Sequence, residues 1–252
     1  MKRMIRILYG NKNKVNKKLL CEVHDSFKNE WAKDEITYYV LGSENEKWLK
    51  DLGAKDVRLV NSKDDMRPAN RSMSHFYNKS YLLEYSMRDY DEILFIDYDT
   101  VAIKRPDERM WSLLREKDGS WHGVFQCPNV SYKNMICLSK DQGGIRDPTI
   151  HTMRKCLNTC LLYCRDKTWV DGHLDAFNTC PSLRIGRVSN FGGGEAVLIY
   201  YLDREYGIMD IQQMTSNFEP KIILLKRGIN GNRWKDLTDF EKKKDEIYFH
   251  HF

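Results

Sequence analysis

The segment Asp91–Ile103, DEILFIDYDTVAI, contains a short apolar run that ends at a carboxylate. A run this short, rich in Ile, Leu and Phe, is typical of a strand buried on both faces. Asp97 and Asp99 follow, two residues apart, where that strand should end. Because side chains alternate along a strand, we expect both carboxylates to point the same way, into the crevice where open α/β sheets bind ligands.

Two carboxylates in this position are suited to Mg²⁺ or Mn²⁺ that carries a diphosphate. The alternative is a polar exit from strand to loop, because a bare Asp-x-Asp pattern is a weak signal. Another such pair, Asp89 and Asp91, comes before the apolar run and is predicted to lie in a turn. Only the pair Asp97 and Asp99 has a buried strand leading into it.

The composition indicates one α/β domain with a substantial core. The chain has 252 residues, of which 41% are hydrophobic and 12% aromatic. This length suits a single domain. The net charge of +5 is mild, and the basic residues are scattered among 36 acidic ones, so a nucleic-acid-binding surface is not indicated.

Neither end of the chain suggests secretion or a membrane. The N-terminal apolar stretch is too short and too interrupted for a signal peptide, and no window approaches the roughly 18 apolar residues of a membrane span. Seven cysteines, without the density of a disulfide scaffold, indicate reduced thiols in a soluble cytoplasmic protein. Cys156, Cys160 and Cys164 are spaced four apart and are expected in the core, along a helix or a strand, with a metal cluster as the alternative.

The first hundred residues alternate strands with helices, which predicts a parallel sheet with crossover helices. The predicted strands are 4–9, 36–41 and 57–60, and the predicted helices are 14–29, 46–52 and 72–87. Arg71, directly before the last helix, and His75 and Lys79 within it recur every four residues and form a basic stripe beside the strand that follows. A solvated basic edge is the alternative for Arg71 and His75.

The second part of the chain is less regular. Extended structure is predicted at 101–103, 122–127, 157–164, 222–225 and 246–252, and a short helical piece at 111–114. The segment 128–148 is predicted to be an irregular loop that is either mobile or acceptor-binding. Gly192–Gly194 precede Glu195, and three glycines let the backbone approach a ligand closely.

Taken together, the alternating first half, the helix with Lys79 and the segment YDEILFIDYDTVAI resemble GT-A-fold glycosyltransferases. The likeness is strongest to the retaining, family 8 group that includes glycogenin and bacterial galactosyltransferases. It runs with gaps from Ile5 to Phe252 and is specific only around the Asp-x-Asp motif. The resemblance implies a central, mostly parallel sheet flanked by helices. It also implies a nucleotide-sugar-binding half, 1–103, and an acceptor-binding half, 104–252.

The resemblance also implies a metal site. The family's Asp-x-Asp motif holds Mn²⁺ on the donor diphosphate, which corresponds to Asp97 and Asp99, with Mg²⁺ as the alternative ion. A His followed by an aromatic residue completes the metal shell, which corresponds to His251 and Phe252. The family's later Lys-Pro-Trp has no counterpart. Two explanations stay open: a domain of a longer polypeptide, or a different diphosphate clamp.

Further site residues follow from the same likeness. A basic residue in the preceding helix touches the donor in the family, and Lys79 stands about there. The end of the first strand, Leu8, Tyr9, Gly10 and Asn11, is the expected place for the base and ribose.

The reacting sugar is expected to meet a second set of residues. The family's Asn-Ser-Gly motif is approximated by Asn158-Thr159-Cys160, with Phe177-Asn178-Thr179 as a competing candidate, and Glu195 resembles the acidic residue that faces the transferred sugar.

The sequence therefore predicts a metal-dependent transfer of a sugar from a nucleoside diphosphate, with UDP expected, to a hydroxyl of a glycan or glycoconjugate. Retention of configuration is expected from the resemblance. The alternatives are a haloacid-dehalogenase-like phosphatase, which needs a later acidic cluster that is not found after residue 101, and a sugar-nucleotide-forming nucleotidyltransferase, which needs a glycine-rich loop after the first strand. A non-catalytic sugar-binding module on the same fold is the third.

Overall fold

The computed structural model describes residues 1–8, 26–40, 42–60, 74–97, 100–115, 124–127, 156–165, 167–179, 223–225, 245 and 248–251. For some of these residues it describes the backbone alone. The predicted helix over 14–29 and the predicted loop over 128–148 lie largely outside these ranges. None of the described helices has the length and apolar character needed to cross a membrane.

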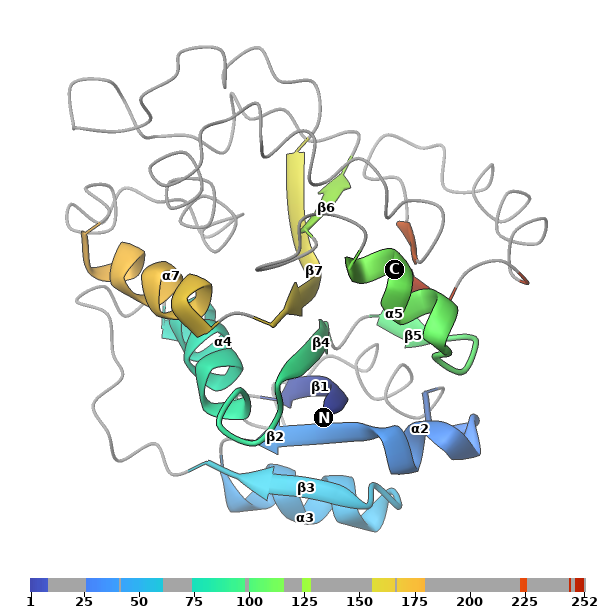
Figure 1. The fold of residues 1–252 in the computed structure, drawn as a ribbon. Helices are drawn as coiled ribbons and strands as arrows, with labels where there is room; N and C mark the ends of the chain where they lie inside the picture. The colour runs from blue at the N-terminus through green and yellow to red at the C-terminus, as the bar shows by residue number, and fades with distance from the viewer. Residues whose placement is uncertain are drawn as a thin grey trace, which may run out of the picture.

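A large sheet of six strands, in the order β3-β2-β1-β4-β7-β6, forms the centre of the fold (Figure 1). The strands are Lys2–Leu8 (β1), Ile36–Val40 (β2), Asp56–Leu59 (β3), Glu92–Ile96 (β4), Val124–Cys127 (β6) and Cys156–Cys164 (β7). The strands β3, β2, β1 and β4 are parallel, and β7 runs antiparallel to both β4 and β6. The prediction of a mostly parallel sheet is confirmed.

The apolar run at the centre of the sequence forms β4, and every residue of this strand is buried. The strand ends at Ile96, so Asp97 already lies beyond it. The alternation of side chains holds only within a strand. The common direction of the two carboxylates stays a prediction, because Asp99 lies outside the described residues.

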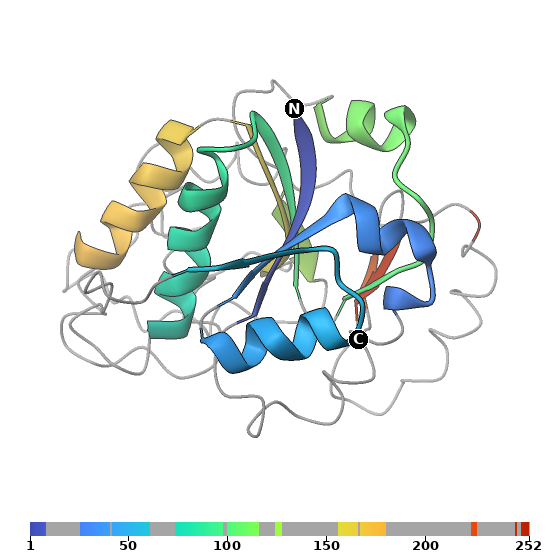
Figure 2. The same ribbon diagram turned by 90° about the horizontal axis from the view of Figure 1, so that it is seen from below.

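Two layers cover the sheet (Figure 2). The helices α4 (Ser74–Ser86) and α7 (Lys167–Thr179) pack side by side on one face. The other face carries α2 (Glu30–Glu35), α3 (Ser43–Asp51), α5 (Glu108–Arg115) and a second sheet. Buried apolar side chains from these elements form one cluster with the large sheet.

The second sheet has three strands in the order β5-β9-β8. Its strands are Thr100–Ala102 (β5), Ile223–Leu225 (β8) and Phe249–His251 (β9). The strand β9 lies in the middle, antiparallel to β5 and parallel to β8. The last strand predicted from the sequence is thus confirmed, and it is held on both sides.

Two helices were not predicted from the sequence. The helix α2 has only six residues, too few to show an apolar period. In α7 the buried positions Val170, His173 and Ala176 recur every three residues, but one of them is a histidine, and Gly172, a poor helix former, lies within the helix. The apolar pattern of α7 was therefore incomplete. The competing motif Phe177-Asn178-Thr179 forms the end of this helix.

Candidate functional site

The neighbouring parallel strands β1 and β4 end at the same edge of the large sheet, which we call the carboxyl edge. Their register pairs Ile5 with Phe95, so that Leu8 and Asp97 both lie where the two strands end. From β1 the chain continues to β2 and β3 on one side, while β4 lies on the other side. A strand order that reverses in this way opens a crevice that binds ligands in α/β proteins.

Asp97 begins the short connection from the large sheet to the small one. Its backbone carbonyl accepts a hydrogen bond from the N–H of Thr100, at 3.2 Å. Thr100 is the first residue of β5 and is fully buried, whereas Asp97 keeps partial exposure. The aspartate is therefore tied at its backbone to a buried residue, which fixes where it leaves the sheet.

The register of the small sheet brings a predicted ligand to this connection. Thr100 lies opposite His251, and Val101 lies opposite His250. Opposed residues of an antiparallel pair have Cα atoms about 4.5–5.5 Å apart. The backbone therefore places His251 across from the residue that follows Asp99 in sequence, and it places His250 one residue farther away.

Asn158 reaches the same edge from the opposite side. The strand β7 runs antiparallel to β4, and Ile96, the last residue of β4, pairs with Leu161. Asn158 comes before Leu161 in β7, so it lies beyond the carboxyl end of β4. On the other side of β7, Asn158 pairs with Phe125, and the register shifts between Val124 and Phe125. Such irregularities are frequent beside active sites because they redirect a strand locally.

Lys79 lies within α4, the helix that leads into β4. A crossover helix between parallel strands runs against their direction, so its N-terminal half lies toward the carboxyl edge. Lys79 belongs to that half. Tyr9, Gly10, Asn11, Asp99 and Glu195 lie outside the described residues, and only the backbone of Leu8, Lys79, Asn158 and His251 is described.

The predicted metal ligands fit a divalent ion in their chemistry, because two carboxylates and an imidazole are competent ligands for Mn²⁺. The described side chains alone hold no group of three metal-ligating residues; Asp99 and the imidazole of His251 are not among them. What the structure adds is the backbone register that brings His251 beside the Asp97–Thr100 connection.

Arg6 is a neighbour of this site that was not predicted from the sequence. Arg6, inside β1, is only 1% exposed, and its Nη2 donates a hydrogen bond to the backbone carbonyl of Thr100. Tyr38 lies opposite Arg6 in β2 and is equally buried. Burial raises the pKa of the Tyr38 hydroxyl, and the positive charge of Arg6 opposes that rise. A charged residue within the otherwise apolar segment MIRIL, at 4–8, was the available signal.

No protein-family model matches the chain, and no curated protein matches it by sequence. Solved structures do match. Mouse xyloside xylosyltransferase 1 in its apo form is 10% identical with a TM-score of 0.54, over 100% of this chain and 98% of that one. The galactosyltransferase LgtC, in complex with donor and acceptor sugar analogues, is 13% identical with a TM-score of 0.52, over 100% of this chain and 87% of that one.

The bifunctional glycosyltransferase WbbM is 12% identical with a TM-score of 0.56, and the match covers 99% of this chain but 45% of WbbM. Identities this low report on the fold. The chain has the α/β fold of these GT-A glycosyltransferases.

Proposed function

We propose that this protein is a metal-dependent glycosyltransferase that moves a sugar from a nucleoside diphosphate to a hydroxyl of a glycan or glycoconjugate. The observation that carries the proposal is the junction of the two sheets. In a glycosyltransferase fold, Asp97 leaves β4 at the reversal of strand order, and the register sets His251 opposite Thr100. UDP as the nucleotide and retention of configuration belong to the same proposal.

In this proposal Asp97, Asp99 and His251 hold Mn²⁺ or Mg²⁺. Two carboxylates and one imidazole leave positions on the ion for two phosphate oxygens. When bound, the ion supplies positive charge to the leaving diphosphate, whose departure is otherwise opposed by its developing negative charge. Lys79 adds a second cation on the donor from the helix α4.

The remaining residues bind and orient the substrates. The end of β1, from Leu8 to Asn11, receives the base and ribose at the carboxyl edge, as the reversal of strand order favours. Glu195 and Asn158 face the transferred sugar. Residues 1–103 bind the donor, and residues 104–252 bind the acceptor.

A thermal-shift screen tests the donor and the metal together. A ligand that binds only the folded state raises the free energy of unfolding by RT ln(1 + [L]/Kd), so we expect one nucleotide sugar to raise the melting temperature more with Mn²⁺ than without it. Turnover of that donor should stop in excess EDTA. Asp99→Ala should abolish turnover while the melting temperature without ligand stays at the wild-type value.

Turnover that persists in EDTA would contradict the metal-dependent mechanism. Donor binding without any transfer or hydrolysis would instead indicate a sugar-binding module on this fold. Release of inorganic phosphate from a phosphomonoester, without use of any nucleotide sugar, would indicate a phosphatase.

A further inference from the structure

Arg6 is the largest fully buried side chain of the described residues. It lies in β1 two residues before the carboxyl edge, and its strand neighbours Met4 and Ile5 are buried and apolar. A guanidinium keeps its positive charge in any protein environment. The strand therefore carries a permanent charge into the core, next to the place where the proposed metal ligands meet.

The described hydrogen bonds of Arg6 involve only part of its guanidinium. Nη2 donates to the carbonyl oxygen of Thr100, but within the described part of the chain Nε and Nη1 have no partner. The neighbouring hydroxyl of Tyr38 lies against this guanidinium, whose charge and hydrogen bonding oppose the rise in the Tyr38 pKa that burial causes. A buried charge costs several kcal/mol unless it is paired, and apolar residues of similar volume often serve stability equally well. Within the described residues, the contact with Thr100 is the hydrogen bond that fixes where the guanidinium lies.

The contact that Arg6 makes joins the two sheets. Arg6 belongs to the large sheet, whereas Thr100 begins β5, one of the two outer strands in the described order of the small sheet. A second contact lies two residues farther along, where Asn29 Nδ2 donates to the carbonyl oxygen of Ala102 at 2.6 Å. The carbonyls of alternate β5 residues are thus held by side chains from outside the small sheet.

The proposed metal ligands come from both sheets, because Asp97 leaves β4 of the large sheet and His251 lies in β9 of the small one. Thr100 stands between them: its N–H bonds to Asp97, its Cα lies opposite His251, and its carbonyl accepts from Arg6. A shift of β5 relative to the large sheet would therefore change the distance between the ligands.

We propose that Arg6 is a positioning residue for the metal site: its hydrogen bond to Thr100 fixes the small sheet against the large one, and so sets the spacing of Asp97 and His251. The inference rests on the proposed function, because it assigns Arg6 a task only if these residues hold a metal. Outer groups that orient metal ligands typically change metal affinity about 10–100-fold when they are removed.

The test is the affinity for Mn²⁺ in the presence of UDP, measured by isothermal titration calorimetry, which does not require turnover. Arg6→Met keeps the length and apolar stem of the side chain but removes its charge and donors. We expect it to weaken Mn²⁺ binding by about tenfold or more, with a melting temperature without metal close to that of the wild type. Arg6→Lys, which keeps a donor, should restore part of the affinity.

Arg3→Met is the matched control. Arg3 lies in the same strand, but its guanidinium donates to Thr37 at 2.8 Å and to Asp56 at 3.3 Å, away from Thr100. Arg3→Met should leave the affinity for Mn²⁺ unchanged, even if it lowers the melting temperature.

Three outcomes would overturn the inference. The first is a folded Arg6→Met protein that binds Mn²⁺ as tightly as the wild type. The second is a failure of both Arg6 variants to fold, which would make Arg6 a residue of stability. The third is an Arg3→Met protein that loses as much affinity. If the wild type itself binds no Mn²⁺ with UDP, the proposed function fails, and the assignment of Arg6 fails with it.

Discussion

Thr100 is a residue through which the two sheets of this protein contact each other. Its N–H bonds to Asp97, its carbonyl accepts from Arg6, and its Cα lies opposite His251. These contacts tie Thr100 to both sheets, so a shift of one sheet would change the position of Thr100 relative to the other. The two histidines of β9 differ in this respect, because only His251 faces Thr100 while His250 faces Val101.

We therefore predict that His251→Ala weakens Mn²⁺ binding in the presence of UDP by at least about tenfold, because it removes a proposed ligand. His250→Ala, one residue away on the same strand, should leave the affinity within about twofold. Isothermal titration calorimetry on both variants measures the difference. Equal losses would show that the strand as a whole matters rather than one imidazole.

Glu92 is the first residue of β4, at the end of the strand away from the proposed site, and its carboxylate is hydrogen-bonded. Both of its carboxylate oxygens accept hydrogen bonds from Arg115, each at 2.7 Å, and Tyr163 donates a further one. Burial alone would raise the pKa of the Glu92 carboxyl, but these partners outweigh it, and the pKa lies below its ordinary value of 4.5.

Glu92→Gln should lower the free energy of unfolding by about 1–2 kcal/mol near neutral pH, because it removes a charge-assisted pair. A carboxyl with a lowered pKa in the folded state stabilises the protein above its unfolded pKa, and this contribution is lost as the pH falls through the folded value. The difference from the wild type should therefore shrink below pH 4.5. Urea denaturation at about pH 7 and about pH 3 measures it.

The exposed pair Glu30 and Lys33, 2.9 Å apart, provides the control. Glu30→Gln should change stability little at either pH, because exposed ion pairs contribute less than about 1 kcal/mol. A Glu92→Gln penalty that stays the same at both pH values would contradict the linkage to ionisation.

At the scale of single elements, the C-terminus of the helix α3 is set by a glycine in its sequence. Gly53 donates its N–H to the carbonyl of Lys50 at 2.9 Å, and Ala54 donates to that of Leu49 at 3.0 Å. This pair of bonds is the Schellman arrangement, in which the glycine adopts a left-handed conformation. The φ of Gly53 is 91°, and nothing lies within 4 Å of a Cβ added there.

Gly53→Ala should therefore cost about 1–2 kcal/mol through backbone conformation alone, since no steric clash adds to it. Chemical denaturation measures the loss. Lys47→Ala, at an exposed position of the same helix, should be close to neutral. An unchanged stability of Gly53→Ala would mean that the helix can end in another conformation without cost.

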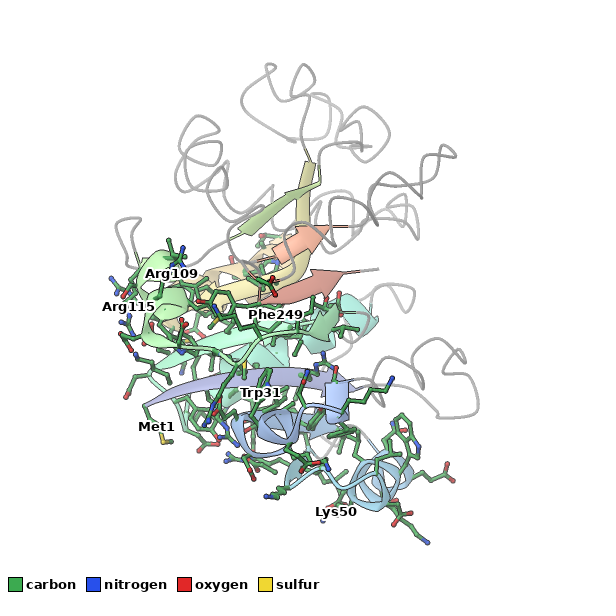
Figure 3. The ribbon with its side chains drawn as sticks, turned by 90° about the vertical axis from the view of Figure 1, so that its right-hand side faces the viewer. Met1, Trp31, Lys50, Arg109, Arg115 and Phe249 are labelled. Atoms are coloured by element: carbon green, nitrogen blue, oxygen red, sulfur yellow. The ribbon has the colours of Figure 1, made fainter. Side chains whose placement is uncertain are left out.

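At the scale of the whole molecule, the two sheets share one apolar core. Phe249 of β9 is fully buried and belongs to the same cluster as Met4, Tyr38 and Ile96 of the large sheet. Figure 3 shows Phe249 between the sheets, while Lys50 and Arg109 lie at the outer surface. The burial of β9 thus depends on residues that are far from it in sequence.

Phe249→Ala should lower the free energy of unfolding by about 3–5 kcal/mol, the usual cost of a large cavity in a core. Leu59→Ala is the comparison, because Leu59 is 40% exposed and should cost far less. Urea denaturation of the two variants tests this. A small cost for Phe249→Ala would show that the small sheet adds little to the stability of the large one.

The sequence by itself determined the central strands. The apolar run before Asp97 predicted β4, and the alternation of strands with helices predicted the parallel order, because these signals are local and follow from periodicity. The resemblance around Asp97 also predicted the fold that the solved glycosyltransferases share. The strand 246–252 was predicted as well, but no local sequence signal indicated which strands it would pair with.

Only the tertiary structure decided that β9 lies between β5 and β8, and that His251 lies opposite Thr100. Pairing between segments some 150 residues apart depends on the whole core and leaves no periodic trace in either segment. The same holds for Arg6. In the sequence it is one basic residue among 41. Its role follows from the burial of β1 and from the carbonyl of Thr100, which the fold brings beside it.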